Sequence, residues 1–246
     1  EWAAEVERLG GGAIKAVLLP QQGPPTLRTM LETAEAGVPG LMSGNGFAGV
    51  MNGDILLDST RLDWAVLLLQ AAIQRGSIGP EVLVIARRTN VEAAGAAGSS
   101  MISSLNSGAT VEFEQVLAAG SLMEDESAMD IFLWTGGRLS TDPLGAVPEF
   151  AVGRVEWDKW LLGRATKRGF SIVDATSLLA PVHLTGSDGN FASRRHDDGR
   201  SPSQLRNRAL YAAAEADGTI DPCVRIACAQ FALERSGDGW ALHRRQ

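Results

Sequence analysis

The amino-acid sequence predicts an α/β protein with a mixed, mostly parallel sheet flanked by helices. Short apolar runs typical of buried strands alternate along the chain with helix-like stretches, and this alternation is typical of parallel sheets. The length of 246 residues suits one large domain of this class. One apolar run, residues 47–51, leads directly into Asn52 and Asp54. Open α/β sheets place their ligand-binding groups at such strand ends.

Composition and charge narrow the class of protein further. Hydrophobic residues make up 45% and charged residues 21%, which is ordinary for a soluble globular chain. The formal net charge of -7 argues against a general nucleic-acid partner. No apolar run reaches the length of about 18 residues that a transmembrane segment needs. Cys223 and Cys228 have apolar flanks and are predicted to be free thiols.

In the first half of the chain, hydrophobic periodicity and turn residues predict three helices, three strands and one insertion. Thr26 is positioned to cap a helix, and Trp64, Leu67 and Leu68 are the core candidates of the next one. Residues 92–108 are rich in Ala, Gly and Ser, which predicts a mobile insertion or surface loop. The elements are helices over residues 2–9, 26–36 and 62–73 and strands over residues 13–19, 47–51 and 82–85.

The second half continues the alternation. Trp157, Trp160 and Leu161 follow the spacing of an amphipathic helix. Ser201 followed by Pro202 is typical of a helix start. The expected elements are strands over residues 130–134, 171–173 and 179–184, helices over 156–168 and 201–214, and a terminal strand pair over 224–233 and 240–242.

The stretch from Asn52 to Asp54 permits two interpretations. Asn-Gly is the strongest short signal for a β-hairpin, so residues 47–57 are compatible with two paired strands. The alternative is a strand end that releases Asp54 at the edge of the sheet, where it can meet a metal or a sugar.

Seven short motifs in a fixed order resemble a known family. In chain order they are Asn52-Gly53-Asp54-Ile55, Val82-Leu83-Val84-Ile85-Ala86-Arg87-Arg88, Asp130-Ile131-Phe132, Gly153-Arg154-x-x-Trp157-Asp158-x-Trp160-Leu161, Val173-Asp174-Ala175-Thr176, Val182-His183 and Arg206-Asn207-x-Ala209-Leu210. The set resembles glycosyltransferase-like proteins with the Rossmann-like nucleotide-diphospho-sugar transferase (GT-A) fold, and it implies a single GT-A-like domain over residues 1–246. This fold opens with a nucleotide-binding βαβ unit. Little of that unit is recognisable before Gly12, which leaves open that the first βαβ unit is missing.

The resemblance implies a metal-dependent glycosyltransferase that moves a sugar from a nucleotide-diphosphate donor to a hydroxyl acceptor. Asn52 and Asp54 stand where such enzymes carry an acidic motif that binds a divalent metal and the donor. Mn²⁺ or Mg²⁺ would neutralise the charge that develops on the diphosphate. Asp54 is then the charged metal ligand, and His183 is the second. The alternative for His183 is a hydrogen-bonded core histidine.

The same resemblance implies further roles around the amphipathic helix. Asp158 would be the base that deprotonates the acceptor hydroxyl, and its alternative role is to cap the helix. Arg154 would pair with Asp158 or hold a phosphate. Arg87 and Arg88 form a donor-diphosphate clamp in which one of the two is expected to be a surface charge. Trp157 is an acceptor platform or a core residue.

Departures from the family pattern motivate a second hypothesis. Asn52 replaces an acid, and the run after His183 lacks a second histidine unless His196 substitutes for it. A catalytically degenerate relative that serves as a structural subunit of a larger complex fits these departures, with the apolar stretch 220–231 facing a protein partner. A third class, an NAD-dependent Rossmann enzyme, is set aside because no Gly-x-Gly-x-x-Gly follows a first strand.

Overall fold

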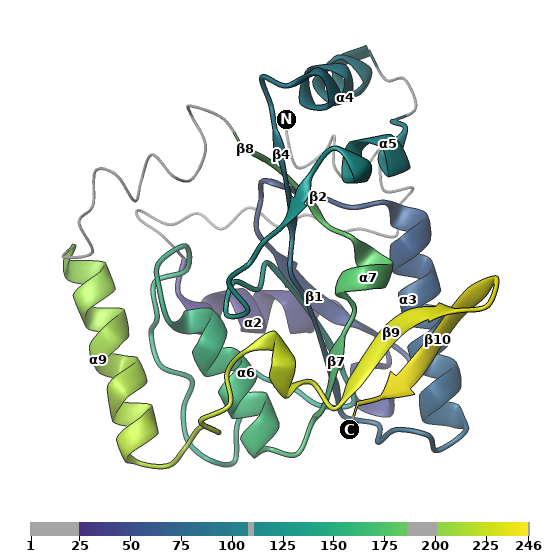
Figure 1. Ribbon diagram of the computed structural model, residues 1–246. Helices are drawn as coiled ribbons and strands as arrows, with labels where there is room; N and C mark the ends of the chain where they lie inside the picture. The colour runs from purple at the N-terminus through teal and green to yellow at the C-terminus, as the bar shows by residue number, and fades with distance from the viewer. Residues whose placement is uncertain (1–24, 108–110, 186–200, 246) are drawn as a thin grey trace.

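The computed structural model describes residues 25–107, 111–185 and 201–245 (Figure 1). The predicted helix over residues 2–9 and the predicted strand over 13–19 lie outside these ranges. The helices are α2 (Leu27–Ala36), α3 (Ser59–Gln74), α4 (Ala96–Ser107), α5 (Phe113–Ala118), α6 (Trp157–Lys167), α7 (Thr176–Leu179) and α9 (Pro202–Ala216), with 3₁₀ turns η1 (Leu41–Ser43) and η2 (Ile226–Cys228). The strands are β1 (Ala48–Met51), β2 (Ile55–Leu56), β3 (Val82–Ala86), β4 (Thr89–Glu92), β5 (Ser121–Leu122), β6 (Ile131–Thr135), β7 (Ser171–Asp174), β8 (Val182–Thr185), β9 (Phe231–Ser236) and β10 (Gly239–Arg244).

The strands form two mixed sheets, in the orders β1-β6-β3-β7-β9-β10 and β2-β8-β4-β5. The α/β class with mixed sheets flanked by helices is therefore confirmed. The expectation of mostly parallel strands is wrong, because five of the eight pairings between described strands are antiparallel and three are parallel. The main reason is β6, which lies antiparallel between β1 and β3. Buried apolar strands look alike whichever way they run, so the sequence does not reveal this reversal.

Helices cover both faces of the larger sheet (Figure 1). Helices α2, α6 and α9 contribute to one hydrophobic cluster, and α3 and α7 contribute to another on the opposite face. Strand β3 divides its side chains between the two: Leu83 and Ile85 belong to the first cluster, and Val82 and Val84 to the second. This alternation follows from the two-residue period of a strand. It explains why all of β3 is buried.

Helix α6 confirms the predicted amphipathic helix and is anchored by a buried cation. Trp160 and Leu161 pack into the first cluster. Arg164, on the same helix, pairs with Asp142 and donates to the carbonyl of Thr219 at 2.7 Å. A buried guanidinium is tolerated only with such partners. Arg164 lies in the last turn of α6, so these contacts fasten the C-terminal end of the helix to the segments around Asp142 and Thr219.

The helix predicted over residues 62–73 corresponds to α3, but its core residues differ from those predicted. Trp64 and Leu67 are 52% and 58% exposed, so their assignment to the core is wrong. Leu68 does pack at the edge of the second cluster. The buried residues of α3 are Ala65, Leu69 and Ala72. Because α3 is apolar on nearly every side, its sequence pattern does not select the face that meets the sheet.

Residues 92–108 do not form the predicted surface loop, because most of them belong to helix α4. Met101 on α4 packs with Val91, Val116 and Val182 in a third, smaller cluster. This cluster lies between α4, α5 and the sheet of β4 and β8. A segment rich in Ala, Gly and Ser can form a helix when tertiary packing stabilises it, and here the packing of Met101 provides that stabilisation.

The terminal strand pair is confirmed as the β9–β10 hairpin, although β9 begins later than predicted. The residues before it form η2, and Cys223 and Cys228 are joined by a disulfide there. The prediction of free thiols is therefore wrong. Apolar flanks indicate a buried cysteine, but they carry no information on whether a second sulfur lies within bonding distance.

Asp174, in the Val173–Thr176 motif, has a structural role at the end of β7. Its carboxylate accepts hydrogen bonds from Arg245 at 2.5 Å and from the backbone N–H of Thr176 at 2.8 Å. Arg245 also donates to the carbonyl of Ile226 at 3.2 Å. The motif therefore fastens the C-terminal hairpin to β7.

Replacing Arg245 with Ala should lower the free energy of unfolding by about 1–2 kcal/mol, because a half-buried charge-assisted hydrogen bond is lost. Arg244→Ala is the matched control, since Arg244 is the neighbouring residue and is exposed. Urea denaturation of both variants measures the difference. Equal stability of the two variants would contradict the structural role of Asp174.

Candidate functional site

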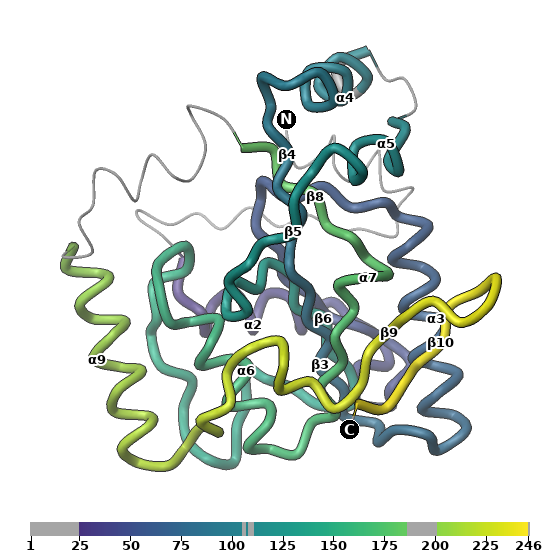
Figure 2. Tube along the Cα trace, in the orientation of Figure 1, coloured from purple at the N-terminus to yellow at the C-terminus, as the bar shows by residue number. Residues whose placement is uncertain are grey.

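A cleft of about 920 Å³ lies where the chain leaves β1 and β3 and enters β6. Antiparallel pairing aligns Met51 and Ala86 with Ile131, so the polar residues next to all three strands emerge at one edge. Figure 2 shows β3 and β6 in the middle of the molecule, with α6 and α9 to one side. The residues of the cleft used below are Asn52, Asp54, Arg88, Asp130, Arg154, Glu156, Trp157, Asp158, Lys159, His183 and Gln204.

Asp54 and His183 meet although they are far apart in the sequence. Strand β2 pairs with β8 so that Ile55 lies opposite His183, which brings the preceding Asp54 alongside the imidazole. His183 Nε2 and Asp54 Oδ2 are 3.1 Å apart. Strand β1 pairs with β6, whereas β2 pairs with β8, so the hairpin interpretation of Asn52–Asp54 is wrong and the strand-end interpretation holds.

The pair of Asp54 and His183 has the chemistry of a small metal site. Mn²⁺ and Mg²⁺ are commonly held by one or two protein side chains together with substrate phosphates. Within the described ranges, no group of three His, Cys, Asp or Glu residues is placed to hold a metal ion. Asp54 and His183 could supply two ligands of such a cation, and the other ligands would have to come from a phosphate group and water. His196 lies outside the described residues.

Asp130 is a residue of the cleft to which the sequence assigned no role. It directly precedes β6 and is only 4% exposed. Its Oδ1 accepts hydrogen bonds from Asn52 Nδ2 at 2.6 Å and from Arg88 Nη1 at 2.7 Å. Arg88 Nε also donates to Asn90 at 3.0 Å. An acid next to an apolar strand was visible in the sequence, but its partner Asn52 lies 78 residues away.

Asp158 lies in the first turn of α6 and faces the cleft. Burial raises the pKa of its carboxyl to about 7, against the opposing effect of a hydrogen bond from the Lys159 backbone N–H at 2.9 Å. The N-cap position of α6 is occupied by Glu156, so Asp158 is not the capping residue. A carboxyl with a pKa near 7 can hold or release a proton at neutral pH.

Arg154 and Trp157 both line the cleft, and the contacts of each bear on its two predicted roles. Arg154 Nε donates to Ser203 Oγ at 3.3 Å, and no hydrogen bond or ion pair joins it to Asp158 among the described contacts. Its predicted pairing with Asp158 is therefore not observed. Trp157 is buried, with its ring centroid 5.5 Å from that of Phe132. Its surroundings are those of a core residue that reaches the cleft wall.

Arg87 and Arg88 point to different places, but neither is the surface charge expected of one of them, because both are half-buried. Arg88 lines the cleft and contacts Asp130. Arg87 donates to the carbonyl of Met123 at 3.1 Å, and its own backbone N–H bonds to Thr176 Oγ1 at 3.1 Å. Arg87 is not among the residues that line the cleft. Its predicted place in a donor clamp is therefore not supported.

Helix α9 supplies two polar residues, Asn207 and Gln204, to which the sequence assigned no role. Asn207 Nδ2 donates to the carbonyls of Ala151 at 3.0 Å and Val155 at 2.9 Å. It thus fixes the segment that leads into α6. Gln204, one turn earlier, is buried and lines the cleft. The buried Oε1 of Gln204 has no hydrogen-bond partner within the described part of the chain.

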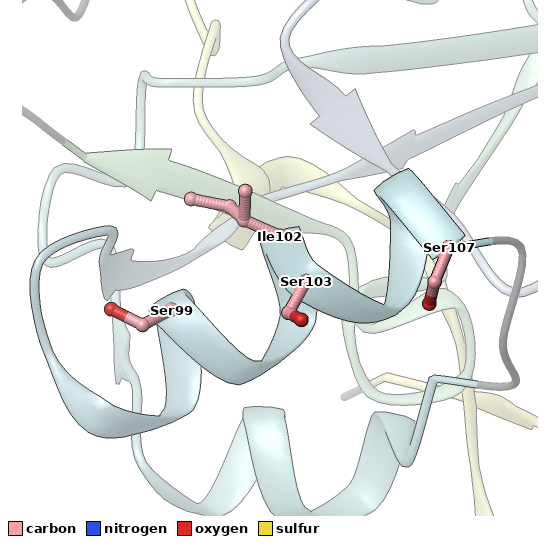
Figure 3. A pocket seen from close by; sticks show the side chains of 4 residues that line it. All are labelled: Ser99, Ile102, Ser103 and Ser107. Atoms are coloured by element: carbon pink, nitrogen blue, oxygen red, sulfur yellow. The ribbon is translucent and has the colours of Figure 1, made fainter.

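A second hollow lies on α4, where Ser99, Ile102, Ser103 and Ser107 line it (Figure 3). All four residues come from one helix. None of them is charged, so the hollow lacks the acidic and basic side chains that converge on the cleft. We therefore assign the functional site to the cleft.

Comparisons of the chain with protein-family models, with curated proteins and with solved structures found no match. Of the helices in the described ranges, none has both the length and the hydropathy needed to cross a membrane. The chemistry of the cleft is therefore the basis for inferring a function.

Proposed function

We propose that the protein is a metal-dependent glycosyltransferase with a GT-A-like fold, which moves a sugar from a nucleotide-diphosphate donor to a hydroxyl acceptor. The observation that carries this proposal is that one cleft contains both the Asp54–His183 pair and Asp158. The pair has the ligands for a divalent cation, and the carboxyl of Asp158 has a pKa of about 7. Glycosyl transfer to a hydroxyl needs both functions: charge neutralisation on the leaving diphosphate and a base at the acceptor.

On the donor side, Asp54 and His183 would hold Mn²⁺ or Mg²⁺, and the bound ion supplies positive charge to the diphosphate. Arg88 and Arg154 line the same cleft and add guanidinium groups that suit phosphate oxygens. Asn52 stands next to them at the end of β1 and orients Asp130. These residues bind and position the donor.

On the acceptor side, Asp158 would accept the proton of the attacking hydroxyl. A base works best when its pKa lies near the operating pH, and the burial of Asp158 brings its pKa to about 7. Asn207 holds the backbone before α6, which fixes where the carboxyl of Asp158 can lie. Trp157 would form part of the wall beside the acceptor.

Asp54→Ala should weaken metal-dependent nucleotide binding by at least about tenfold, because it removes the only carboxylate of the proposed metal site. Calorimetric titration of UDP and of GDP, each with and without Mn²⁺, measures this. Asp63→Ala is the matched control, since Asp63 is an exposed aspartate on α3. Retention of full Mn²⁺-dependent affinity by Asp54→Ala would contradict the metal role of this residue.

A second candidate function is a catalytically degenerate relative that serves as a structural subunit of a larger complex. Its specific support is the exposure of Trp64 and Leu67 on α3, on the opposite face of the sheet from α6. The same titration separates the two candidates. If the wild type binds neither UDP nor GDP and migrates as part of a larger assembly, the subunit role is favoured.

A further inference from the structure

The cleft contains a buried carboxylate oxygen, Asp130 Oδ2, that has no role in the proposed transfer as described above. Asp130 is 96% buried, because its exposed fraction is 4%. Its Oδ1 accepts hydrogen bonds from both Asn52 and Arg88. Its Oδ2 is buried and has no hydrogen-bond partner among the described residues. A buried acceptor that is left unpaired is costly, so such an atom at a cleft wall indicates a ligand group.

The surroundings of Asp130 define what that ligand group is. A carboxylate oxygen only accepts hydrogen bonds, so its partner must be a donor. The charge of Asp130 is already balanced by Arg88, whose Nη1 lies 2.7 Å from Oδ1. A second cation is therefore not required, and a neutral hydroxyl is sufficient. The strand end that carries Asn52 also carries Asp54, which places Asp130 on the donor side of the cleft.

We infer that Asp130 Oδ2 binds a hydroxyl group of the nucleotide-sugar donor. This inference rests on the proposed function and adds to it a residue that recognises the donor. A ribose and a hexose both present hydroxyls of the required kind. The shared chemistry is a sugar hydroxyl that donates to a fixed, charge-balanced carboxylate.

The inference also explains why position 52 has an asparagine where the family pattern has an acid. A carboxylate at position 52 would lie beside that of Asp130, and two such acids in contact repel each other. The amide of Asn52 instead donates to Oδ1 at 2.6 Å and leaves Oδ2 for a ligand. The acid that binds the donor hydroxyl is therefore Asp130, immediately before β6, and Asn52, immediately after β1, orients it.

Asp130→Asn is the informative variant. Its amide oxygen can still accept from Asn52 and Arg88, whereas the amide nitrogen replaces Oδ2 and cannot accept a hydrogen bond. Calorimetry in the presence of Mn²⁺ compares UDP with 2′-deoxy-UDP, 3′-deoxy-UDP, UDP-glucose and UDP-N-acetylglucosamine. The guanine series uses GDP, 2′-deoxy-GDP, 3′-deoxy-GDP and GDP-mannose. Asp63→Asn is the control for loss of an exposed charge, and melting temperatures confirm that each variant is folded.

The wild type should prefer the ligand with the recognised hydroxyl by about tenfold or more, as expected for a hydrogen bond to a charged group. In Asp130→Asn this preference should shrink to about threefold or less. A lost preference between UDP and a deoxy-UDP assigns the hydroxyl to the ribose. A lost preference between a UDP-sugar and UDP assigns it to the transferred sugar. The guanine series is evaluated in the same way.

Two outcomes would overturn the inference while the proposed function stands. In one, Asp130→Asn keeps the hydroxyl preference of the wild type. In the other, it weakens all ligands by the same factor, which would mean that Asp130 acts only through Arg88 and Asn52. If the folded wild type binds none of the nucleotides, the proposed function fails and the inference fails with it.

Discussion

Replacing Asp158 with Asn is expected to lower kcat by about 10²–10⁴-fold, the usual contribution of a general base. Donor affinity should remain within about twofold, because Asp158 is assigned to the acceptor and not to the donor. Asn has nearly the same shape as Asp and removes only the ability to take up a proton. Release of nucleotide diphosphate in the presence of a hydroxyl acceptor measures kcat, and calorimetry measures donor affinity. A loss of donor affinity equal to the loss of kcat would contradict the assignment.

The pKa of Asp158 gives this prediction a pH dependence with a defined sign. The carboxyl must be ionised to act as a base, so kcat should rise with pH through about 7, the pKa that burial gives it. In the unfolded chain the pKa is 3.8, so between the two values the folded state binds more protons than the unfolded state. Stability from this group is therefore fully present below the lower value and is lost as pH rises towards the higher one.

Asp158→Asn should accordingly melt at a higher temperature than the wild type at about pH 8, and at a similar temperature at about pH 4. This gain in stability accompanies the loss of activity, because the same burial that tunes the base disfavours its charged form. Asp63→Asn should show no such pH-dependent gain, since Asp63 is exposed. A flat pH profile of kcat in the wild type would contradict the role of Asp158.

The parts of the fold that the sequence predicted are those with local causes. Helix α6 was predicted because its apolar residues recur with the helical period, and its burial confirms that. Thr26 was predicted as a cap, and its hydroxyl accepts from the Thr29 backbone N–H at 3.3 Å. The end of β1 was expected to release polar groups at the sheet edge, and Asn52 and Asp54 do line the cleft. Each of these depends on residues within about one turn or one strand.

The parts that the sequence did not predict depend on contacts between distant segments. The direction of β6 decides that Asp130 and Asn52 meet, and no local pattern encodes that direction. The exposed face of α3 was misassigned because only the packed sheet selects among its apolar residues. The sequence does not reveal the burial of Gln204 for the same reason: a glutamine at the start of a helix resembles a surface residue, and only the packing of α9 against α6 buries it. The folded cleft therefore contains polar residues, Asp130 and Gln204, to which the separate sequence motifs assigned no role.

Glu35 is a further example, and it carries the largest stability effect that we expect. It lies on α2 and is 2% exposed. Its carboxylate accepts hydrogen bonds from Trp134 Nε1 at 3.1 Å and from the backbone N–H groups of Leu139 and Ser140 at 2.6 and 3.1 Å. The hydroxyl of Ser140 donates to its second oxygen. One side chain therefore joins α2, β6 and the loop that follows β6.

Glu35→Ala should lower the free energy of unfolding by about 3–5 kcal/mol, because it leaves several buried donors without an acceptor. For a chain of this length the melting temperature should fall by on the order of 10 °C. Glu35→Gln should lose less, because one oxygen remains to accept. Urea and thermal denaturation measure both variants.

Glu32→Ala provides the matched control on the same helix. Glu32 precedes Glu35 by about one turn and is exposed, so its removal should change stability by no more than about 0.5 kcal/mol. Helix propensity alone would make the two alanine variants equally stable or slightly more stable than the wild type. If Glu35→Ala behaved like Glu32→Ala, the hydrogen bonds to Trp134, Leu139 and Ser140 would contribute nothing to the fold. A large difference between them would establish that this buried acid holds α2 against the sheet that carries the cleft.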